Sequence, residues 1–147
     1  MNLKDYLTED RILVLQGSTK SEILAELAET ISQNGSIQAP DLLAAVNERE
    51  KLMSTGIGHG LAVPHVRLKK LRQLKVALGV CPQGVSDYTS LDDEPVKIIV
   101  MIAAPEGQHD SYIKLLAKVV ESLKQEKVRQ NIQQAQNAQE IYSILTG

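Results

Sequence analysis

Aromatic side chains are scarce in this sequence of 147 residues. It holds no tryptophan and no phenylalanine, and four tyrosines make up its whole aromatic content of 3%. Proteins that bind single-stranded nucleic acid or sugar rings use aromatic side chains as stacking surfaces, so this supply argues against both classes. The hydrophobic core must therefore be built from aliphatic side chains.

Cysteine, net charge and long hydrophobic runs are also sparse. Cys81 is the only cysteine, which excludes an internal disulfide. Because it stands at the end of a predicted strand, beside Pro82, we expect its side chain to be small, apolar and buried. The 16 Lys and Arg side chains nearly balance 18 Asp and Glu, so nothing attracts the chain strongly to nucleic acid or anionic lipid. The most apolar run, residues 98–105, is far shorter than the roughly 20 residues of a membrane span. No signal-peptide pattern opens the sequence. We therefore expect a cytoplasmic protein with no nucleic-acid partner and no membrane insertion.

What the sequence does contain is the composition of an ordinary globular protein, with 43% hydrophobic and 23% charged residues. This length suits one domain, over residues 1–147. Strands are expected where short apolar or β-branched runs stand between turn residues: residues 11–15, 61–63, 74–80 and 96–104. Helices before, between and after these strands predict an α/β fold.

The helices are marked by caps and by apolar spacing. Thr19 and Glu22 have the spacing of a capping box, and the helix that follows ends at an Asn-Gly pair. Pro40 suits the first turn of a second helix that reaches about residue 50. A long amphipathic helix begins near Asp110, with its apolar stripe at Ile113, Leu116, Val119, Val120 and Leu123. Residues 138–145 form the last helix, with Asn137 and Glu140 as its cap pair.

A glycine-rich loop, residues 54–60, lies directly before His65. Glycines let a backbone approach a ligand closely and point its amides at an anion. Pro64 stiffens the chain beside the His65 imidazole, which is substantially neutral at pH 7 and can act as a nucleophile or base. His109 lies at the start of the long helix, where free amides favour negative charge. Two arginines are candidate cations for a phosphate, Arg49 and Arg67.

Nucleotide, cofactor and metal chemistry fit less well. Leu61 stands where a dinucleotide fingerprint needs its third glycine, and no Gly-Lys-Ser/Thr follows for a P-loop, so no cofactor is predicted. The three histidines have neither the local spacing nor the carboxylates of a zinc site, so no metal is predicted.

Arg49 and residues 54–67, Ser-Thr-Gly-Ile-Gly-His-Gly-Leu-Ala-Val-Pro-His-Val-Arg, resemble a known signature. It is that of the enzyme IIA domains of the bacterial phosphoenolpyruvate-dependent phosphotransferase system, mannitol/fructose class. The similarity extends over essentially the whole chain, through Ala-Ala-Pro at 103–105, His109 and Glu-Ile-Tyr at 140–142. It implies a mixed β-sheet flanked by helices on both faces, with the active histidine at a strand end.

The resemblance implies a phosphocarrier. The histidine phosphocarrier protein would donate a phosphoryl group to His65, which would pass it to an enzyme IIB in sugar uptake. His109 would stabilise the phosphoryl group, and Arg49 would pair with its oxygens or orient the site. Further hydrogen-bond donors would come from Ser54, Thr55 and Gly58.

Three alternatives stay open. A nitrogen-type regulatory enzyme IIA would carry the same histidine and use its phosphorylation state to change which protein docks. A second alternative is that residues 1–147 form one domain of a larger permease or regulator. His59 is not part of the family pattern, and either tunes the site electrostatically or is a solvated loop residue. Where the family often has Asp-Trp, this chain has Asp87-Tyr88, which affects local packing.

Overall fold

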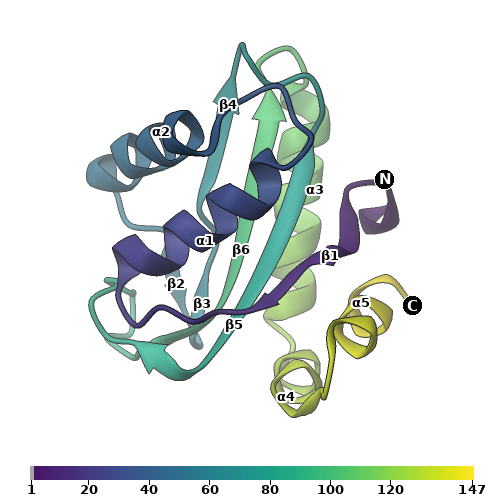
Figure 1. The fold of residues 1–147 in the computed structure, drawn as a ribbon. Helices are drawn as coiled ribbons and strands as arrows, with labels where there is room; N and C mark the ends of the chain where they lie inside the picture. The colour runs from purple at the N-terminus through teal and green to yellow at the C-terminus, as the bar shows by residue number, and fades with distance from the viewer. Residues whose placement is uncertain (1) are drawn as a thin grey trace.

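A mixed β-sheet runs through the middle of the protein with helices on both faces. Figure 1 shows it for residues 2–147, which the computed structural model describes. The strands are β1 (Leu7–Val14), β2 (Gly56–Gly58), β3 (Leu61–Ala62), β4 (His65–Leu68), β5 (Lys75–Val85) and β6 (Val96–Pro105). The helices are η1 (Leu3–Asp5), α1 (Lys20–Ser32), α2 (Ala39–Leu52), α3 (His109–Leu123), α4 (Glu126–Gln134) and α5 (Ala138–Thr146). The prediction of one α/β domain is confirmed.

The antiparallel pair β5–β6 forms the centre of the sheet. β1 lies parallel to β5 on one side, and β3 and β4 lie parallel to β6 on the other. β2 pairs antiparallel with β3, so the order is β1-β5-β6-β3-β2, with β4 also paired to β6. Parallel and antiparallel neighbours therefore occur in one sheet, as the resemblance implied.

Side chains of the two central strands alternate between two hydrophobic cores, because successive residues of a strand point to opposite faces. One core joins Ile99 and Met101 to α1 and α2. The other joins Ile98 and Val100 to α3, α4 and α5. Figure 1 shows α1 in front of the sheet and α3 behind it. Since both faces are covered, β6 is apolar along nearly its whole length, which is the run that the sequence predicted.

β3 and β4 behave as one strand with an interruption, on the same side of β6. Leu61 pairs with Ile98 and His65 pairs with Ile102, so both strands keep the same register against β6. The break falls at Val63 and Pro64, because proline has no N–H to donate to a ladder. The Pro64 carbonyl still accepts a hydrogen bond from the Ile102 N–H at 3.0 Å. The interruption positions His65 as the first residue of β4.

The predicted helix starts are confirmed. The Glu22 N–H donates to the Thr19 hydroxyl and the Thr19 N–H donates to the Glu22 carboxylate, both at 3.2 Å, which completes the capping box. Pro40 lies in the first turn of α2. The Asn137 side chain accepts from the Glu140 N–H at 2.9 Å at the start of α5. These ends were predictable because each cap is made by residues close in sequence.

Several elements differ from the prediction. β1 begins at Leu7 instead of Arg11, because exposed polar residues and an irregular register hide its first half. The predicted strand at 61–63 is β3, which ends at Ala62, and β4 after it was not predicted. α4 was not predicted, since Ile132 is its only buried residue. Cys81 is buried, at 1% exposure, as expected. No helix within residues 2–147 is long and apolar enough to cross a membrane.

Candidate functional site

The His65 side chain is oriented by the chain break that precedes it. Its Nδ1 atom lies 2.7 Å from the carbonyl oxygen of Val63, two residues earlier. A carbonyl oxygen only accepts hydrogen bonds, so Nδ1 carries the hydrogen of the neutral ring. The lone pair is then on Nε2. This arrangement makes Nε2 the nucleophilic atom of His65.

The surroundings of His65 keep its ring neutral. Burial lowers the pKa of the imidazole below its ordinary value of 6.5, and this is the largest effect. The hydrogen bond to Val63 raises that pKa, the positive charge of Arg49 lowers it, and Glu50 raises it. Because the net direction is downward, His65 is mostly unprotonated at pH 7.

His65, His109 and Arg49 line one open pocket of about 490 Å³. The pocket lies at the β4 edge of the sheet, where α2 from one face and the start of α3 from the other approach the same strand. Arg67 also lines it, and Glu48 contributes the single carboxylate of the lining. Two guanidinium groups beside a neutral imidazole suit a phosphoryl group, whose oxygens are anionic. The structure therefore brings together four of the candidate residues from the sequence.

Arg49 also holds the end of its own helix. Its Nη1 donates to the carbonyl oxygen of Met53 at 3.1 Å, just beyond the last turn of α2. A cation at a helix C-terminus is favourable because the final carbonyls are unpaired there. The guanidinium is thus positioned at the pocket by a contact within the chain.

Tyr112 is a pocket residue that the sequence analysis did not single out. Its ring centroid lies 5.7 Å from that of His65, with the two planes tilted by 51°. The Arg67 guanidinium carbon lies 5.6 Å from the same tyrosine ring, within cation–π range. Tyr112 therefore packs against both His65 and one of the two pocket arginines.

The apolar stripe of α3 is offset from the predicted one. Its buried residues are Tyr112, Leu115, Val119 and Leu123, whereas Ile113 is 46% exposed. The prediction that Ile113 faces the core was wrong, because the stripe was started from an aliphatic residue. Counting back by four and then three from Val119 would have reached Tyr112.

His109 shares the pocket but does not touch His65. It is the first residue of α3, and its side chain is exposed. Within residues 2–147 it makes no hydrogen bond and no ring contact. His109 therefore lies at the rim of the pocket, one helical turn before Tyr112.

The structure does not bring Ser54, Thr55 and Gly58 to this pocket. The Ser54 hydroxyl donates to the Thr89 carbonyl oxygen at 2.6 Å. The Gly58 N–H donates to the Ser90 hydroxyl at 3.0 Å. Both bonds tie the glycine-rich loop to residues 89–90, so these donors are already engaged by the protein.

Thr55 belongs to a buried polar cluster behind the site. Its hydroxyl lies 2.6 Å from the Glu50 carboxylate, to which it donates, and 2.7 Å from the Tyr88 hydroxyl. Lys20 of α1 lies 3.0 Å from the same carboxylate and 4.4 Å from the Tyr88 ring centroid. Burial raises the pKa of Tyr88, so its phenol stays protonated. The cluster, defined as Lys20, Glu50, Thr55 and Tyr88, fixes the loop to α1 and α2.

Gly56 lies where this loop touches residues 89–90, and an added methyl group would overlap the Thr89 carbonyl oxygen. We expect Gly56→Ala to lower the free energy of unfolding by about 1–3 kcal/mol, as overpacking does. Gly107→Ala is the matched control, because nothing lies within 4 Å of its added methyl group. Urea unfolding of both variants measures the difference. Equal stability of the two variants would contradict the close packing of the loop.

His59 is exposed and has left-handed backbone, with φ of 57°. Its N–H donates to the Asp92 carboxylate at 2.9 Å. The hydrogen bond explains how a non-glycine residue is held in this conformation. The His59 side chain does not line the His65 pocket.

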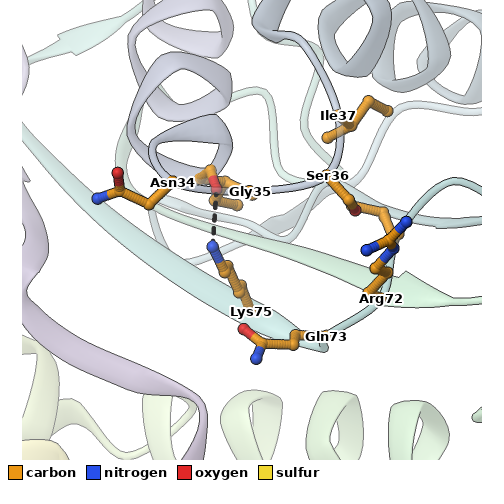
Figure 2. A pocket seen from close by; sticks show the side chains of 9 residues that line it. Asn34, Gly35, Ser36, Ile37, Arg72, Gln73 and Lys75 are labelled. Atoms are coloured by element: carbon orange, nitrogen blue, oxygen red, sulfur yellow. Dashed lines mark hydrogen bonds between the residues drawn. The ribbon is translucent and has the colours of Figure 1, made fainter.

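A second pocket, of about 260 Å³, lies between the end of α1 and residues 71–75 (Figure 2). Lys75 donates there to the Ile31 carbonyl oxygen at 3.5 Å, near the C-terminal end of α1. Burial lowers the pKa of Lys75, with a smaller effect in the same direction from Arg11. None of the predicted site residues lines this pocket, so the candidate chemistry belongs to the pocket that His65 lines. In residues 2–147, no cluster of His, Cys, Asp and Glu has the arrangement of a metal site.

Known proteins match the chain along nearly its whole length. Residues 5–147 match the family model described as phosphoenolpyruvate-dependent sugar phosphotransferase system, EIIA 2. A nitrogen regulatory protein of Bradyrhizobium diazoefficiens is 29% identical over 146 residues, covering 99% of this chain and 95% of that protein. The fructose-specific EIIABC component of Bacillus subtilis is 29% identical over 147 residues, covering 99% of this chain and 23% of that protein.

A solved structure shares the fold. The crystal structure of nitrogen regulatory protein IIA-Ntr from Neisseria meningitidis superposes with a TM-score of 0.93 at 26% identity. The match covers 98% of this chain and 99% of that one. The sheet order and the helices on both faces are therefore shared with a protein of similar length.

Proposed function

The chain belongs to the EIIA 2 family of the phosphoenolpyruvate-dependent sugar phosphotransferase system, and on that premise we propose that it is a histidine phosphocarrier. His65 accepts a phosphoryl group from the histidine phosphocarrier protein and passes it to an enzyme IIB. The observation that carries the proposal is the bond between His65 Nδ1 and the Val63 carbonyl. It leaves Nε2 as the free nucleophile of a pocket with two arginines.

The transfer exchanges one nitrogen–phosphorus bond for another. The lone pair on His65 Nε2 attacks the phosphorus, and the bond to the donor imidazole breaks, with its electron pair returning to the donor nitrogen. Nothing is oxidised or reduced, and Nδ1 keeps its hydrogen bond to Val63. Such a reaction asks the protein mainly for alignment and for neutralisation of the phosphoryl oxygens.

Each pocket residue has a role in this proposal. Arg49 and Arg67 attract and neutralise the phosphoryl oxygens, since both line the pocket. His109 lies at the rim, where it meets the incoming partner more readily than the phosphorus. A supporting role suits Ser54, Thr55 and Gly58 better than direct phosphoryl contact, because their hydrogen bonds already go to protein atoms.

The test is the intact mass after incubation with phosphoenolpyruvate, enzyme I and the histidine phosphocarrier protein. We expect the gain of one phosphoryl group, labile in acid, and its loss when an enzyme IIB is added. No gain at any enzyme concentration would overturn the assignment as a phosphocarrier.

A regulatory role is the second candidate, and a particular observation favours it. The nitrogen regulatory protein IIA-Ntr from Neisseria meningitidis superposes on this chain with a TM-score of 0.93. In that role, phosphorylation adds negative charge to the His65 pocket and changes which protein docks there. Phosphorylation without onward transfer to fructose- or mannitol-class enzyme IIB proteins would favour this candidate over transport.

The lowered pKa of His65 gives a pH prediction. A protonated imidazole has no lone pair, so the rate of phosphoryl acceptance should hold as the pH falls to 6.5 and decline only below it.

The same pKa shift affects stability. Between pH 6.5 and the lower pKa of the folded state, the unfolded chain binds a proton at His65 that the folded chain does not. The contribution of neutral His65 to the free energy of unfolding is therefore fully present above pH 6.5 and is lost as the pH falls toward the folded-state pKa.

An NMR titration of the His65 imidazole and urea unfolding at several pH values measure both effects. The His65→Gln variant is the control, because it cannot titrate and should lose this part of the pH slope. A midpoint for His65 above 6.5 would contradict the prediction.

A further inference from the structure

We propose that Thr55 is a positioning residue for the transfer. Its carbonyl holds Val63, and Val63 in turn holds the His65 ring in the tautomer that has its lone pair on Nε2. This role rests on the phosphocarrier function above and adds to it the residue that orients the nucleophile. Thr55 then acts on the reaction without touching the phosphoryl group.

A backbone hydrogen bond links Thr55 to the group that orients His65. The Val63 N–H donates to the Thr55 carbonyl oxygen at 3.1 Å, which extends the antiparallel pairing of β2 with β3 by one residue. The carbonyl of the same valine accepts from His65 Nδ1 at 2.7 Å. Val63 is thus the single residue between Thr55 and the nucleophile.

The Val63 carbonyl is held from both sides along the chain. Before it, the Val63 N–H is bonded to Thr55, and after it, the Pro64 carbonyl oxygen accepts from the Ile102 N–H at 3.0 Å. A residue that precedes proline is also restricted to extended backbone, which limits the rotation of its carbonyl. Since β6 anchors the Pro64 side, the contact with Thr55 fixes the opposite side.

Thr55 is anchored in turn by the buried cluster. Its N–H donates to one Glu50 carboxylate oxygen at 3.2 Å, and its hydroxyl donates to the other at 2.6 Å. Because the hydroxyl hydrogen is used in that bond, the Tyr88 hydroxyl, 2.7 Å away, is the donor to Thr55. Thr55 is 6% exposed, and both of its donors and its carbonyl are bonded within the protein. The cluster therefore holds the Thr55 carbonyl in place under Val63.

The tautomer matters because a neutral imidazole has one hydrogen and two nitrogens that can carry it. Only the form with the hydrogen on Nδ1 leaves the Nε2 lone pair free to attack phosphorus. If the Val63 carbonyl turned away, Nδ1 would lose its acceptor, and part of the population would carry the hydrogen on Nε2. The contact with Thr55 thus raises the fraction of the protein that is ready to react.

Thr55→Val is the first test, because valine keeps the branched shape of threonine and removes the hydroxyl that binds Glu50. In the pH range where the ring is neutral, we expect the nitrogen NMR shifts of His65 to move from the Nδ1–H form toward a mixture of tautomers. The single-turnover rate of phosphoryl acceptance should fall about 2- to 10-fold, the range of one lost hydrogen bond. Thr55→Ser restores the hydroxyl and should recover most of both.

Thr30→Val is the matched control. Thr30 is also a buried threonine, at 9% exposure, but it lies on α1, outside the cluster and outside the residues that line the His65 pocket. Its substitution should leave both the tautomer of His65 and the rate of acceptance at the wild-type values. An equal change in Thr30→Val would overturn the specific role of Thr55.

A second variant acts on the backbone link itself. Incorporation of the α-hydroxy analogue of valine at residue 63 replaces the N–H by an ester oxygen, so the bond to the Thr55 carbonyl is lost while the side chain stays. We expect the same shift of the His65 ring toward mixed tautomers, with the fold retained by circular dichroism. This variant decides the role of the link even if Thr55→Val fails to fold.

The outcomes separate the role of Thr55 from the proposed function. A wild-type tautomer or a wild-type rate in folded Thr55→Val, or a wild-type tautomer in the ester variant, would overturn the positioning role. Ring shifts that move as expected, in a chain that accepts no phosphoryl group from the histidine phosphocarrier protein, would keep Thr55 as the residue that orients His65 and overturn the phosphocarrier function. A wild-type ring with its hydrogen on Nε2 would overturn the role of Thr55 directly, because Val63 would then orient nothing.

Discussion

His65→Ala should take up no acid-labile phosphoryl group under conditions in which the wild-type chain gains one. Nε2 of His65 is the atom that the structure presents as a nucleophile, because Nδ1 is held by the Val63 carbonyl at 2.7 Å. Neither of the other histidines has this arrangement. Alanine offers no nucleophile, so the loss should be complete rather than partial. Intact mass after incubation with the donor proteins measures it.

The matched controls are His59→Ala and His109→Ala. Both side chains are exposed, and neither contacts His65, so both variants should still accept the phosphoryl group. Circular dichroism checks that His65→Ala folds, which we expect because the half-buried ring lies at the edge of the sheet. A phosphoryl gain retained in His65→Ala would show that another residue is the acceptor.

The position of His65 was predictable from sequence because its cause is local. Pro64 interrupts the strand, and the carbonyl that orients the ring belongs to Val63, two residues away. The resemblance to enzyme IIA domains of the phosphotransferase system is also confirmed, over residues 5–147. Helix caps such as Thr19 with Glu22 were equally accessible, since each is made within one turn.

What the sequence could not predict depends on partners far along the chain. β4 exists because residues 65–68 pair with the end of β6, more than 30 residues later. Tyr112 reaches His65 only because α3 packs on the face of the sheet next to β4. An apolar stripe drawn from sequence alone could start at Tyr112 or Ile113, and only the packing of α3 decides between them.

The predicted hydrogen-bond donors to the phosphoryl group also have partners far along the chain. Ser54 and Gly58 have the chemistry of phosphate donors, and sequence alone gives no sign that their partners are Thr89 and Ser90. A glycine-rich loop predicts close approach of the backbone to something. Here the neighbour is another loop of the same chain, as the contact of Gly56 with Thr89 also indicates.

Glu50→Ala should have the largest effect on stability, lowering the free energy of unfolding by about 3 kcal/mol or more. The Glu50 side chain is 4% exposed and pairs with Lys20 of α1 at 3.0 Å. Its carboxylate also accepts from the Thr55 hydroxyl and N–H, at 2.6 and 3.2 Å. Removing one partner of a buried pair leaves the other charge and its donors uncompensated, which costs more than the pair contributes.

A neighbouring ion pair supplies the control. Glu48 and Lys51 lie at the same distance, 3.0 Å, but their side chains are 73% and 72% exposed. Glu48→Ala should therefore change stability by no more than about 1 kcal/mol, the range of surface pairs. Urea unfolding of both variants at one pH gives the comparison. Equal losses would mean that burial of the Glu50 cluster contributes nothing.

Glu50→Ala should also slow phosphoryl acceptance beyond its effect on the folded fraction. Glu50 follows Arg49 on α2 and holds Thr55, so its loss frees both the end of that helix and the glycine-rich loop. Glu50→Gln keeps the shape and an accepting oxygen, and should recover part of the rate measured at a temperature where both variants are folded. A rate for folded Glu50→Ala equal to the wild type would restrict the cluster to stability. A slower rate partly recovered in Glu50→Gln would connect α1, through Lys20, to the orientation of the His65 pocket.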